Sequence, residues 1–316
     1  MQRHIIKAND WFAKGQRLNF DYQEKRIKTK ESVQTLNVFQ RLIHHRAEDQ
    51  YCITMLPGFP DGSFGWARVE AFLEAVNDSP RLYIEYVGQG DSDKPAKYPY
   101  GISERADLVE ALWAYYGIES TFVVTFDYSS LVALELLRRQ QEGSSRPVQI
   151  SKVLLINGGL FADAHSHPYM TTPLLKTQFG KMGTRFVQKS QWMFKLMMKS
   201  LWSKEYGVTQ EELNELFEVI PRRNGALFLH NAATFVDEHK HHAQRLDLLN
   251  IYKQVHEKVD FHIVGSVQDQ FEPQQIVKAK ERLGKYNIDI RMLPGGHMTT
   301  SEHPDLLGAM IQELDK

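Results

Sequence analysis

The stretch "STFVVTFDYSSLVALELLRR", residues 120–139, decides the fold prediction for this chain. Its first part is apolar and β-branched, which is typical of a buried strand, and its last part spaces apolar residues as a helix does. Asp127 stands at the junction, and no glycine or proline lies beside it. The sequence therefore predicts a sharp strand-to-helix turn that carries a carboxylate at its tip.

A turn that lifts a nucleophile above a parallel sheet needs small residues two positions before and two positions after the tip, because the backbone is crowded there. Asp127 has Thr125 and Ser129 at these two positions. Either Ser129 or Ser130 at the tip would have a large apolar residue two positions later. The spacing therefore favours Asp127 as the nucleophile, and it predicts that the two serines cap the following helix.

Strand-like and helix-like segments alternate on both sides of this turn. Two strands of a hairpin are predicted at residues 16–27 and 32–45, and further buried strands at residues 51–58, 81–88 and 150–159. Near-continuous apolar strands separated by helices are typical of a parallel sheet covered on both faces. We therefore predict an α/β fold with a mostly parallel sheet of eight strands.

The alternation is interrupted once. Residues 160–247 have a helical pattern rich in Met, Phe and Trp, after which strands return at residues 259–265 and 288–296. This predicts a helical cap at 160–247 inserted into a core made of residues 1–159 and 248–316.

Two further residues at strand ends complete a candidate catalytic triad. His297, in "LPGGHMTTSEHP", precedes the last helix, and Asp269, in "VGSVQDQFEP", follows the preceding strand. A carboxylate nucleophile forms a covalent ester, a histidine activates the water that hydrolyses it, and an acid orients the histidine. Each residue alone has an ordinary structural explanation as a turn, cap or surface residue. Together, in the order nucleophile, acid, histidine, Asp127, Asp269 and His297 indicate a hydrolase site.

The loop "MLPGFPDGSFGW", residues 55–66, is the candidate oxyanion loop. It follows the third predicted strand, where such folds supply a backbone N–H group, here that of Phe59. The second donor is predicted to be the N–H group of Tyr128, next to the nucleophile. Turn chemistry alone would also explain the Gly and Pro residues of this loop.

These segments resemble the α/β hydrolases of the epoxide hydrolase and haloalkane dehalogenase group. The resemblance rests on "LPGFPDGSFGW", "EYVGQGDSDKP", "TFDYSSLVALEL", "VQDQFEP" and "GGHMTTSEHP". Within the group, "FDYSSLVALELL" and "KVLLINGGLF" look most like the mesoderm-specific transcript proteins. The resemblance implies the α/β-hydrolase fold, the triad Asp127, Asp269 and His297, and an oxyanion hole at Phe59 and Tyr128. The chain departs from the family pattern at Pro57, Glu85, Thr125, Phe126 and Ser129.

The resemblance leaves the substrate open. Dehalogenases of this group bind the halide through Trp or Asn N–H groups, and the matching positions here are Phe59 and Tyr128, so an epoxide is preferred. Epoxide hydrolases use cap tyrosines as acids, which makes Tyr169 and Tyr206 candidates. The weak candidates for the substrate pocket are Trp66, Tyr169, Trp192, Trp202 and Tyr206. A dehalogenase-like enzyme, a serine esterase using Ser129 or Ser130, and a non-catalytic binding protein remain alternatives.

Composition adds expectations about partners. The 316 residues include 38 basic and 39 acidic ones, so no basic excess suggests a nucleic-acid partner. The single cysteine, Cys52, lies in an apolar run and is expected to be a buried thiol. No secretory signal is evident, and no apolar run approaches the about 18 residues of a membrane span. We expect a cytoplasmic protein that acts on a small molecule, without cofactor, metal or stable membrane insertion.

Overall fold

The computed structural model describes residues 5–143, 148–165, 177–223, 235–286 and 288–316. It contains a sheet of nine strands in the order β2-β1-β3-β5-β4-β6-β7-β8-β9. The strands are β1 (Gln16–Asp21), β2 (Arg26–Lys28), β3 (Thr35–Ile43), β4 (Tyr51–Leu56), β5 (Arg81–Ile84), β6 (Ser120–Phe126), β7 (Gln149–Ile156), β8 (Asp260–Ser266) and β9 (Asp289–Leu293). Strands β4 to β9 are parallel to one another, whereas β1, β2 and β3 pair antiparallel.

The mostly parallel sheet is confirmed, but the predicted number of strands was one too low. The strand predicted at residues 16–27 is two strands, β1 and β2, joined by a tight turn. The Asp21 carboxylate accepts hydrogen bonds from the backbone N–H groups of Gln23 and Glu24, at 3.1 and 3.0 Å. This local side-chain bond closes the turn, and alternation of residue types along a strand does not reveal it.

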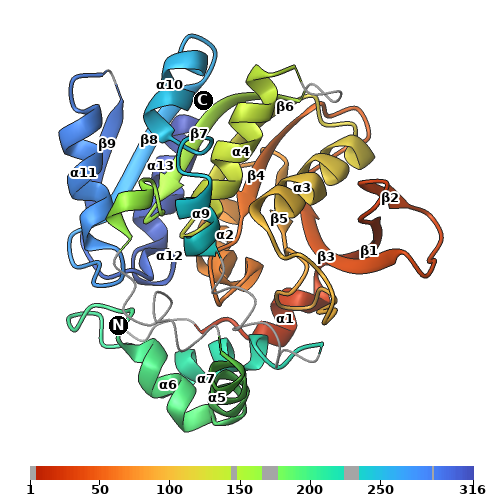
Figure 1. Ribbon diagram of the computed structural model, residues 1–316, viewed down its shortest axis with the longest axis vertical. Coiled ribbons are helices and arrows are strands. Elements are labelled where there is room, and N and C mark those ends of the chain that lie inside the picture. The colour runs from red at the N-terminus through yellow and green to blue at the C-terminus, as the bar shows by residue number, and fades with distance from the viewer. Residues whose placement is uncertain (1–4, 144–147, 166–176, 224–234, 287) are drawn as a thin grey trace.

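Helices cover both faces of the sheet, as predicted (Figure 1). Helices α3 (Ile102–Tyr116), α4 (Ser129–Gln141) and α10 (Leu248–Val255) lie on one face, and α2 (Ala67–Val76) and α13 (Pro304–Leu314) pack together on the other. The other helices within residues 5–143 and 248–316 are α1 (Ala8–Ala13), η1 (Ser63–Trp66), α11 (Pro273–Leu283) and α12 (Thr299–Glu302). Within the described residues, no helix combines the length and the apolar character that crossing a bilayer requires.

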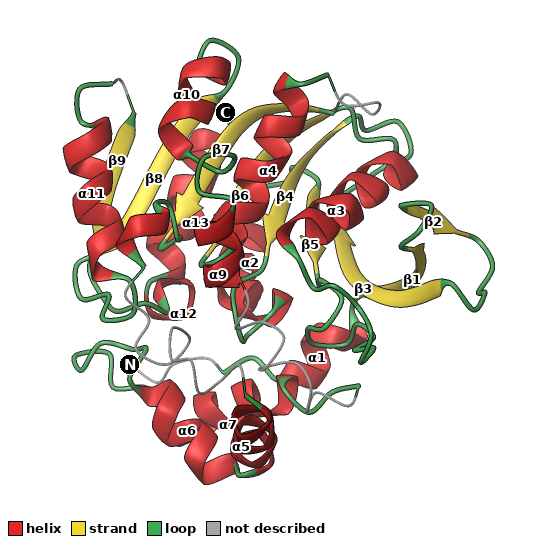
Figure 2. Ribbon diagram, viewed as in Figure 1, coloured by secondary structure: helices red, strands yellow, loops and turns green. Residues whose placement is uncertain are grey.

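Between β7 and β8, the described residues form helices and no strand. Besides α10, these elements are η2 (Ala162–Ala164), α5 (Gln178–Lys189), α6 (Gln191–Lys199), α7 (Gln210–Val219) and α9 (Phe235–His241). Helices α5, α6 and α7 gather at one end of the molecule, near α1 (Figure 2). Helix α7 begins with a capping box, in which Thr209 and Glu212 bond to each other's backbone N–H group. The division into core and cap at residues 160 and 247 stays a prediction.

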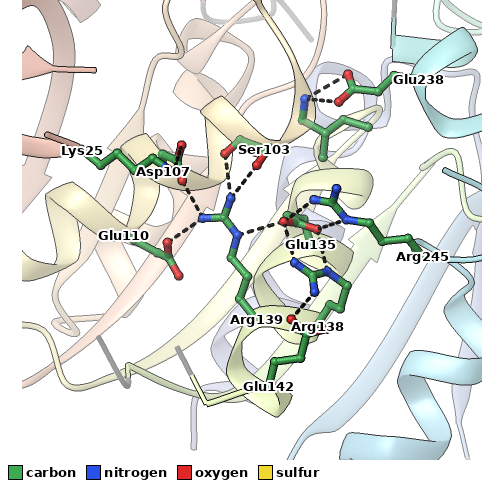
Figure 3. A network of polar contacts seen from close by, with 11 residues as sticks. Lys25, Ser103, Asp107, Glu110, Glu135, Arg138, Arg139, Glu142, Glu238 and Arg245 are labelled. Atoms are coloured by element: carbon green, nitrogen blue, oxygen red, sulfur yellow. Dashed lines mark hydrogen bonds and ion pairs between the residues drawn. The ribbon is translucent and has the colours of Figure 1, made fainter. Parts of the chain in front are cut away.

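A buried carboxylate on α4 forms ion pairs within the helix and with a neighbouring segment (Figure 3). The side chain of Glu135 is 1% exposed and accepts hydrogen bonds from Arg138 and Arg139 of its own helix and from Arg245. Arg139 continues the network across to α3, where it bonds to Asp107 at 2.8 Å. Burial opposes the charge of Glu135, but Arg138 and then the other arginines lower its pKa to about 2.

Replacing Glu135 with glutamine is expected to lower the free energy of unfolding by about 3 kcal/mol, because three arginines then lose a buried counter-charge. The lowered pKa means that this stabilisation is present above the unfolded value and is lost as the pH falls from about 4.5 toward 2. Urea denaturation at several pH values measures both effects. As a control, Glu142→Gln, at an exposed partner of Arg138, should cost less than about 0.5 kcal/mol. Equal effects of the two changes would contradict the assignment.

Candidate active site

The turn after β6 holds Asp127 in a strained backbone conformation. Its φ angle is 57°, in the left-handed region that side chains other than glycine rarely adopt. The backbone N–H of Asp127 still pairs with Ile156 of the neighbouring strand β7, at 2.9 Å, so the strain begins where the sheet ends. Strain of this kind persists where the surrounding structure holds it, which is frequent at functional sites.

The two serines after Asp127 do not cap α4, so that prediction was wrong. The Ser129 hydroxyl donates to the carbonyl of Pro57, and the Ser130 hydroxyl donates to the carbonyl of Asp127 at 3.0 Å. Both side chains are fully buried. Ser129 therefore joins the turn to the loop after β4, and neither hydroxyl lies beside the ring of His297, as a serine nucleophile would.

Asp127, Asp269 and His297 converge at the carboxyl ends of β6, β8 and β9. His297 Nδ1 lies 3.2 and 3.1 Å from the two carboxylate oxygens of Asp269. On the other side of the ring, His297 Nε2 lies 3.5 Å from Asp127 Oδ1. The histidine ring thus lies between two carboxylates, in the order that a relay from acid to base to nucleophile requires.

The three side chains are closed off from solvent, which governs the charge of the histidine. Burial by itself would lower the pKa of His297, but Asp269 and then Asp127 raise it well above its ordinary value. The two carboxyl groups beside the ring therefore favour the protonated form of His297. A buried charge of this kind is stable only while both partners keep their charge.

The loop after β4 provides a backbone donor to the proposed nucleophile. The N–H group of Phe59 donates to Asp127 Oδ2 at 3.1 Å. Tyr128 is also buried, and its ring packs edge-on against Phe59. The function of the Tyr128 N–H group as a second donor stays a prediction.

Two polar side chains outside the predicted triad hold these loops in place. Asn157 at the end of β7 has a φ angle of 46° and donates to the carbonyl of His297 at 2.7 Å and to Ser266 at 2.9 Å. Glu85 at the end of β5 accepts a hydrogen bond from the Ser63 N–H group in the oxyanion loop, at 2.7 Å. Both follow buried strands, which is the signal that could have identified them.

The pocket candidates are distributed over different environments. Trp66 is buried, but its indole N–H donates to the Leu56 carbonyl at 3.1 Å. Trp192 is 72% exposed, so it lies outside any buried pocket. The Tyr206 hydroxyl donates to Glu212 at 2.5 Å. Trp202 is buried, lines a cavity, and its indole N–H has no hydrogen-bond partner among the described residues.

Tyr169, the remaining pocket candidate, lies outside the described residues. Its proposed function as a cap acid stays a prediction.

Asp61 is a site residue that sequence reasoning missed. Asp61 lines the same cavity as Trp202 and Met298, and neither of its carboxyl oxygens has a hydrogen-bond partner in the part of the chain that the structure describes. Burial and then the charge of Asp127 raise the pKa of Asp61 to about 8, which favours the neutral form of the carboxyl group at pH 7. Its place two residues after Phe59 in the oxyanion loop was the available signal, but burial of a carboxyl group cannot be seen in one sequence.

Among the described residues, no group of three or more His, Cys, Asp or Glu side chains is arranged to hold a metal ion. The described triad is joined by hydrogen bonds and ion pairs between its own members.

Comparisons with known proteins bear on the fold and on what the sequence is similar to. No family model matches the chain. The mesoderm-specific transcript protein of Mus musculus is 27% identical over 197 residues, which cover 61% of this chain and 58% of that protein. LipZ of Mycobacterium tuberculosis, named as a hydrolase, is 25% identical over 198 residues, which cover 62% of this chain and 66% of that protein. The chain thus matches less than two thirds of the length of either relative.

Solved structures share the fold over most of the chain. The haloalkane dehalogenase DbeA-M1 loop variant from Bradyrhizobium elkanii has a TM-score of 0.63 at 17% identity, covering 89% of this chain and 93% of that one. The epoxide hydrolase CorEH has a TM-score of 0.61 at 16% identity, covering 88% and 94%. At these identities the solved structures establish the fold. The chain is an α/β-hydrolase-fold protein, similar in sequence to the mesoderm-specific transcript proteins.

Proposed function

We propose that this protein is a hydrolase that opens a small apolar epoxide through an ester on Asp127. The observation that supports this most directly is the environment of the Asp127 carboxylate. One oxygen accepts a hydrogen bond from the Phe59 N–H group at 3.1 Å, and the other lies 3.5 Å from His297 Nε2. A relative named as a hydrolase, and solved structures named as an epoxide hydrolase and a haloalkane dehalogenase, support the reaction class.

In the first step, Asp127 Oδ1 attacks an epoxide carbon and the carbon–oxygen bond of the ring breaks. The ring oxygen takes the electron pair of that bond and needs a proton. Asp61 is the proposed donor, since burial and then the charge of Asp127 raise its pKa to about 8, which favours the protonated carboxyl group at pH 7. The products of this step are an alkyl ester on Asp127 and a carboxylate on Asp61.

In the second step, the ester is hydrolysed. Esterification removes the negative charge of Asp127, which is one of the contributions that keep the proton on His297. The imidazolium can then return a proton to the Asp61 carboxylate and act as a neutral base toward water. The hydroxide attacks the ester carbon, and the negative charge on Oδ2 is stabilised by the Phe59 N–H group. Collapse of this intermediate releases the diol and restores the Asp127 carboxylate.

A halide leaving group is the second candidate, supported by one observation. The buried indole N–H of Trp202 lines the cavity and has no hydrogen-bond partner within the described ranges, and such a group can donate to a halide. A dehalogenase needs two donors of this kind, and the two family positions hold Phe59 and Tyr128. The epoxide therefore remains the preferred substrate class, since an acid is available at Asp61.

Hydrolysis in water enriched in oxygen-18 tests the ester mechanism. Water attacks the ester carbon of Asp127, so repeated turnover should place the heavy isotope in the peptide that contains Asp127 and in no other. Mass spectrometry of the digested protein measures this, with the peptide containing Asp269 as the internal control. Turnover without labelling of the Asp127 peptide would show that water attacks the substrate directly. Tight binding of epoxides without any turnover would identify a binding protein.

Replacing Asp61 with asparagine is expected to slow ester formation about 100-fold, because the opening ring loses its proton donor. The wild-type rate of this step should fall as the pH rises through about 8, where Asp61 loses its proton. The variant should lack that dependence. Single-turnover measurements between pH 6 and pH 9 test both points. If the variant keeps the wild-type pH profile, Asp61 is not the acid.

A further inference from the structure

Helices α5 and α6 carry large apolar side chains on their outer surface. On α5, Phe179, Met182 and Phe186 are 75, 64 and 66% exposed, and their spacing of three and four residues places them on one side of the helix. On α6, Trp192 and Leu196 are 72 and 63% exposed and lie four residues apart. We call these five residues the outer apolar face. Exposed apolar patches that are larger than scattered single residues mark interaction sites.

The outer apolar face is separate from the packing of the helices onto the protein. Phe194 and Met198 of α6 are buried, and the Phe194 ring packs against Phe217 of α7 with 5.4 Å between ring centroids. The side of α6 that faces the protein is therefore already apolar and filled. A helix that is apolar on both sides is normally covered on both sides.

The charge of the surrounding sequence indicates what kind of partner covers the outer apolar face. Residues 164–204 contain seven Lys and Arg residues and not a single Asp or Glu, although the whole chain has 38 basic and 39 acidic residues. Lys189 and Lys199, at the ends of α5 and α6, are exposed beside the outer apolar face. Lysine is depleted at the centres of protein–protein interfaces, whereas Trp, Phe and Leu flanked by Lys are typical of helices that lie on a membrane.

We propose that the outer apolar face docks on an anionic lipid bilayer. The apolar side chains enter the boundary between headgroups and acyl chains, and the lysines bind the negatively charged headgroups. This is attachment to one leaflet, and it requires no helix that crosses the bilayer. The proposal is independent of the catalytic mechanism, because it uses none of the triad residues.

Vesicle flotation with the full chain tests the proposal. The protein should float with vesicles of phosphatidylcholine that contain about 30% phosphatidylserine, and about tenfold less with pure phosphatidylcholine vesicles, since each lysine gains from the anionic surface. Binding should also weaken as salt is added. Tryptophan emission gives a second readout: Trp11, Trp66, Trp113 and Trp202 are buried, so a blue shift on vesicle addition reports on Trp192.

The triple variant Phe179→Ser, Phe186→Ser and Trp192→Ser should lose binding to the anionic vesicles by at least about tenfold. The matched control is Val277→Ser with Leu306→Ser, two exposed apolar residues elsewhere on the surface, which should leave vesicle binding unchanged. Circular dichroism melting of each variant separates lost binding from lost folding. Equal binding by the triple variant and the control would overturn the proposal. Failure of the folded wild type to bind either vesicle, with self-association that the triple variant abolishes, would instead assign the face to a second copy of the chain.

Discussion

The His297→Gln variant is expected to react once with an epoxide substrate and then stop, with the substrate attached to Asp127. The attack by Asp127 Oδ1 does not require a base, whereas hydrolysis of the ester needs one to activate water. Steady-state turnover should fall about a thousandfold. Intact-protein mass spectrometry should show the chain heavier by the mass of one substrate molecule. After digestion, the added mass should lie on the peptide that contains Asp127.

Glutamine is the chosen replacement because it fills much of the space between Asp127 and Asp269 and can still form hydrogen bonds. The matched control is Asp269→Asn, which keeps the His297 ring but weakens its orientation. Its turnover should fall, and the ester should accumulate to a smaller extent than with His297→Gln. Undiminished steady-state turnover by His297→Gln would remove the histidine from the mechanism.

The Asp127→Ala variant is expected to show neither the adduct nor turnover, with activity reduced at least about 10⁴-fold, because the nucleophile itself is gone. Because the φ angle of 57° at this position suits aspartate better than alanine, circular dichroism should establish that the variant is folded. Intact-protein mass spectrometry and product formation measure the two losses together. Asp127→Asn is a less useful variant, because an amide at this position can hydrolyse back to the acid.

The serine variant Ser129→Ala separates this mechanism from a serine esterase. The Ser129 hydroxyl donates to the Pro57 carbonyl and does not face His297, so its loss should cost stability of about 1 kcal/mol and leave the adduct on Asp127. An adduct on Ser129 or Ser130 in the wild-type protein would assign the reaction to a serine nucleophile.

Most of the fold could be predicted from the sequence, because the central parallel strands are largely buried and rich in apolar residues. Strand β6, for example, is buried from Thr121 to Phe126 and is apolar or small throughout. The edge strand β9 is an exception, since it is only half-buried throughout. The edge of the sheet was less predictable. The strand predicted at residues 16–27 divides because the Asp21 carboxylate bonds to two backbone N–H groups, and that contact depends on the local path of the chain.

The positions of the three triad candidates along the chain also followed from the sequence. Parallel strands all end at the same edge of the sheet, so residues that directly follow them approach one another without further information. The side-chain environments did not follow. Asp61 became a candidate acid only because the fold buries its carboxyl group and places Asp127 close enough to raise its pKa. The Ser129 hydroxyl proved to connect the turn after β6 with the loop after β4 through a hydrogen bond to the Pro57 carbonyl.

The tryptophans also show that the sequence does not reveal the environment of a side chain. Trp192 and Trp202 belong to one Met- and aromatic-rich segment, and spacing alone treats them alike. In the folded protein Trp192 is 72% exposed on the outer apolar face, whereas Trp202 is 7% exposed in the cavity. The sequence by itself determined the order of strands and helices and the edge of the sheet that holds the candidate site. The tertiary structure decided which polar groups lack hydrogen-bond partners and which apolar side chains are exposed to solvent. Both properties depend on neighbours that are distant in the chain.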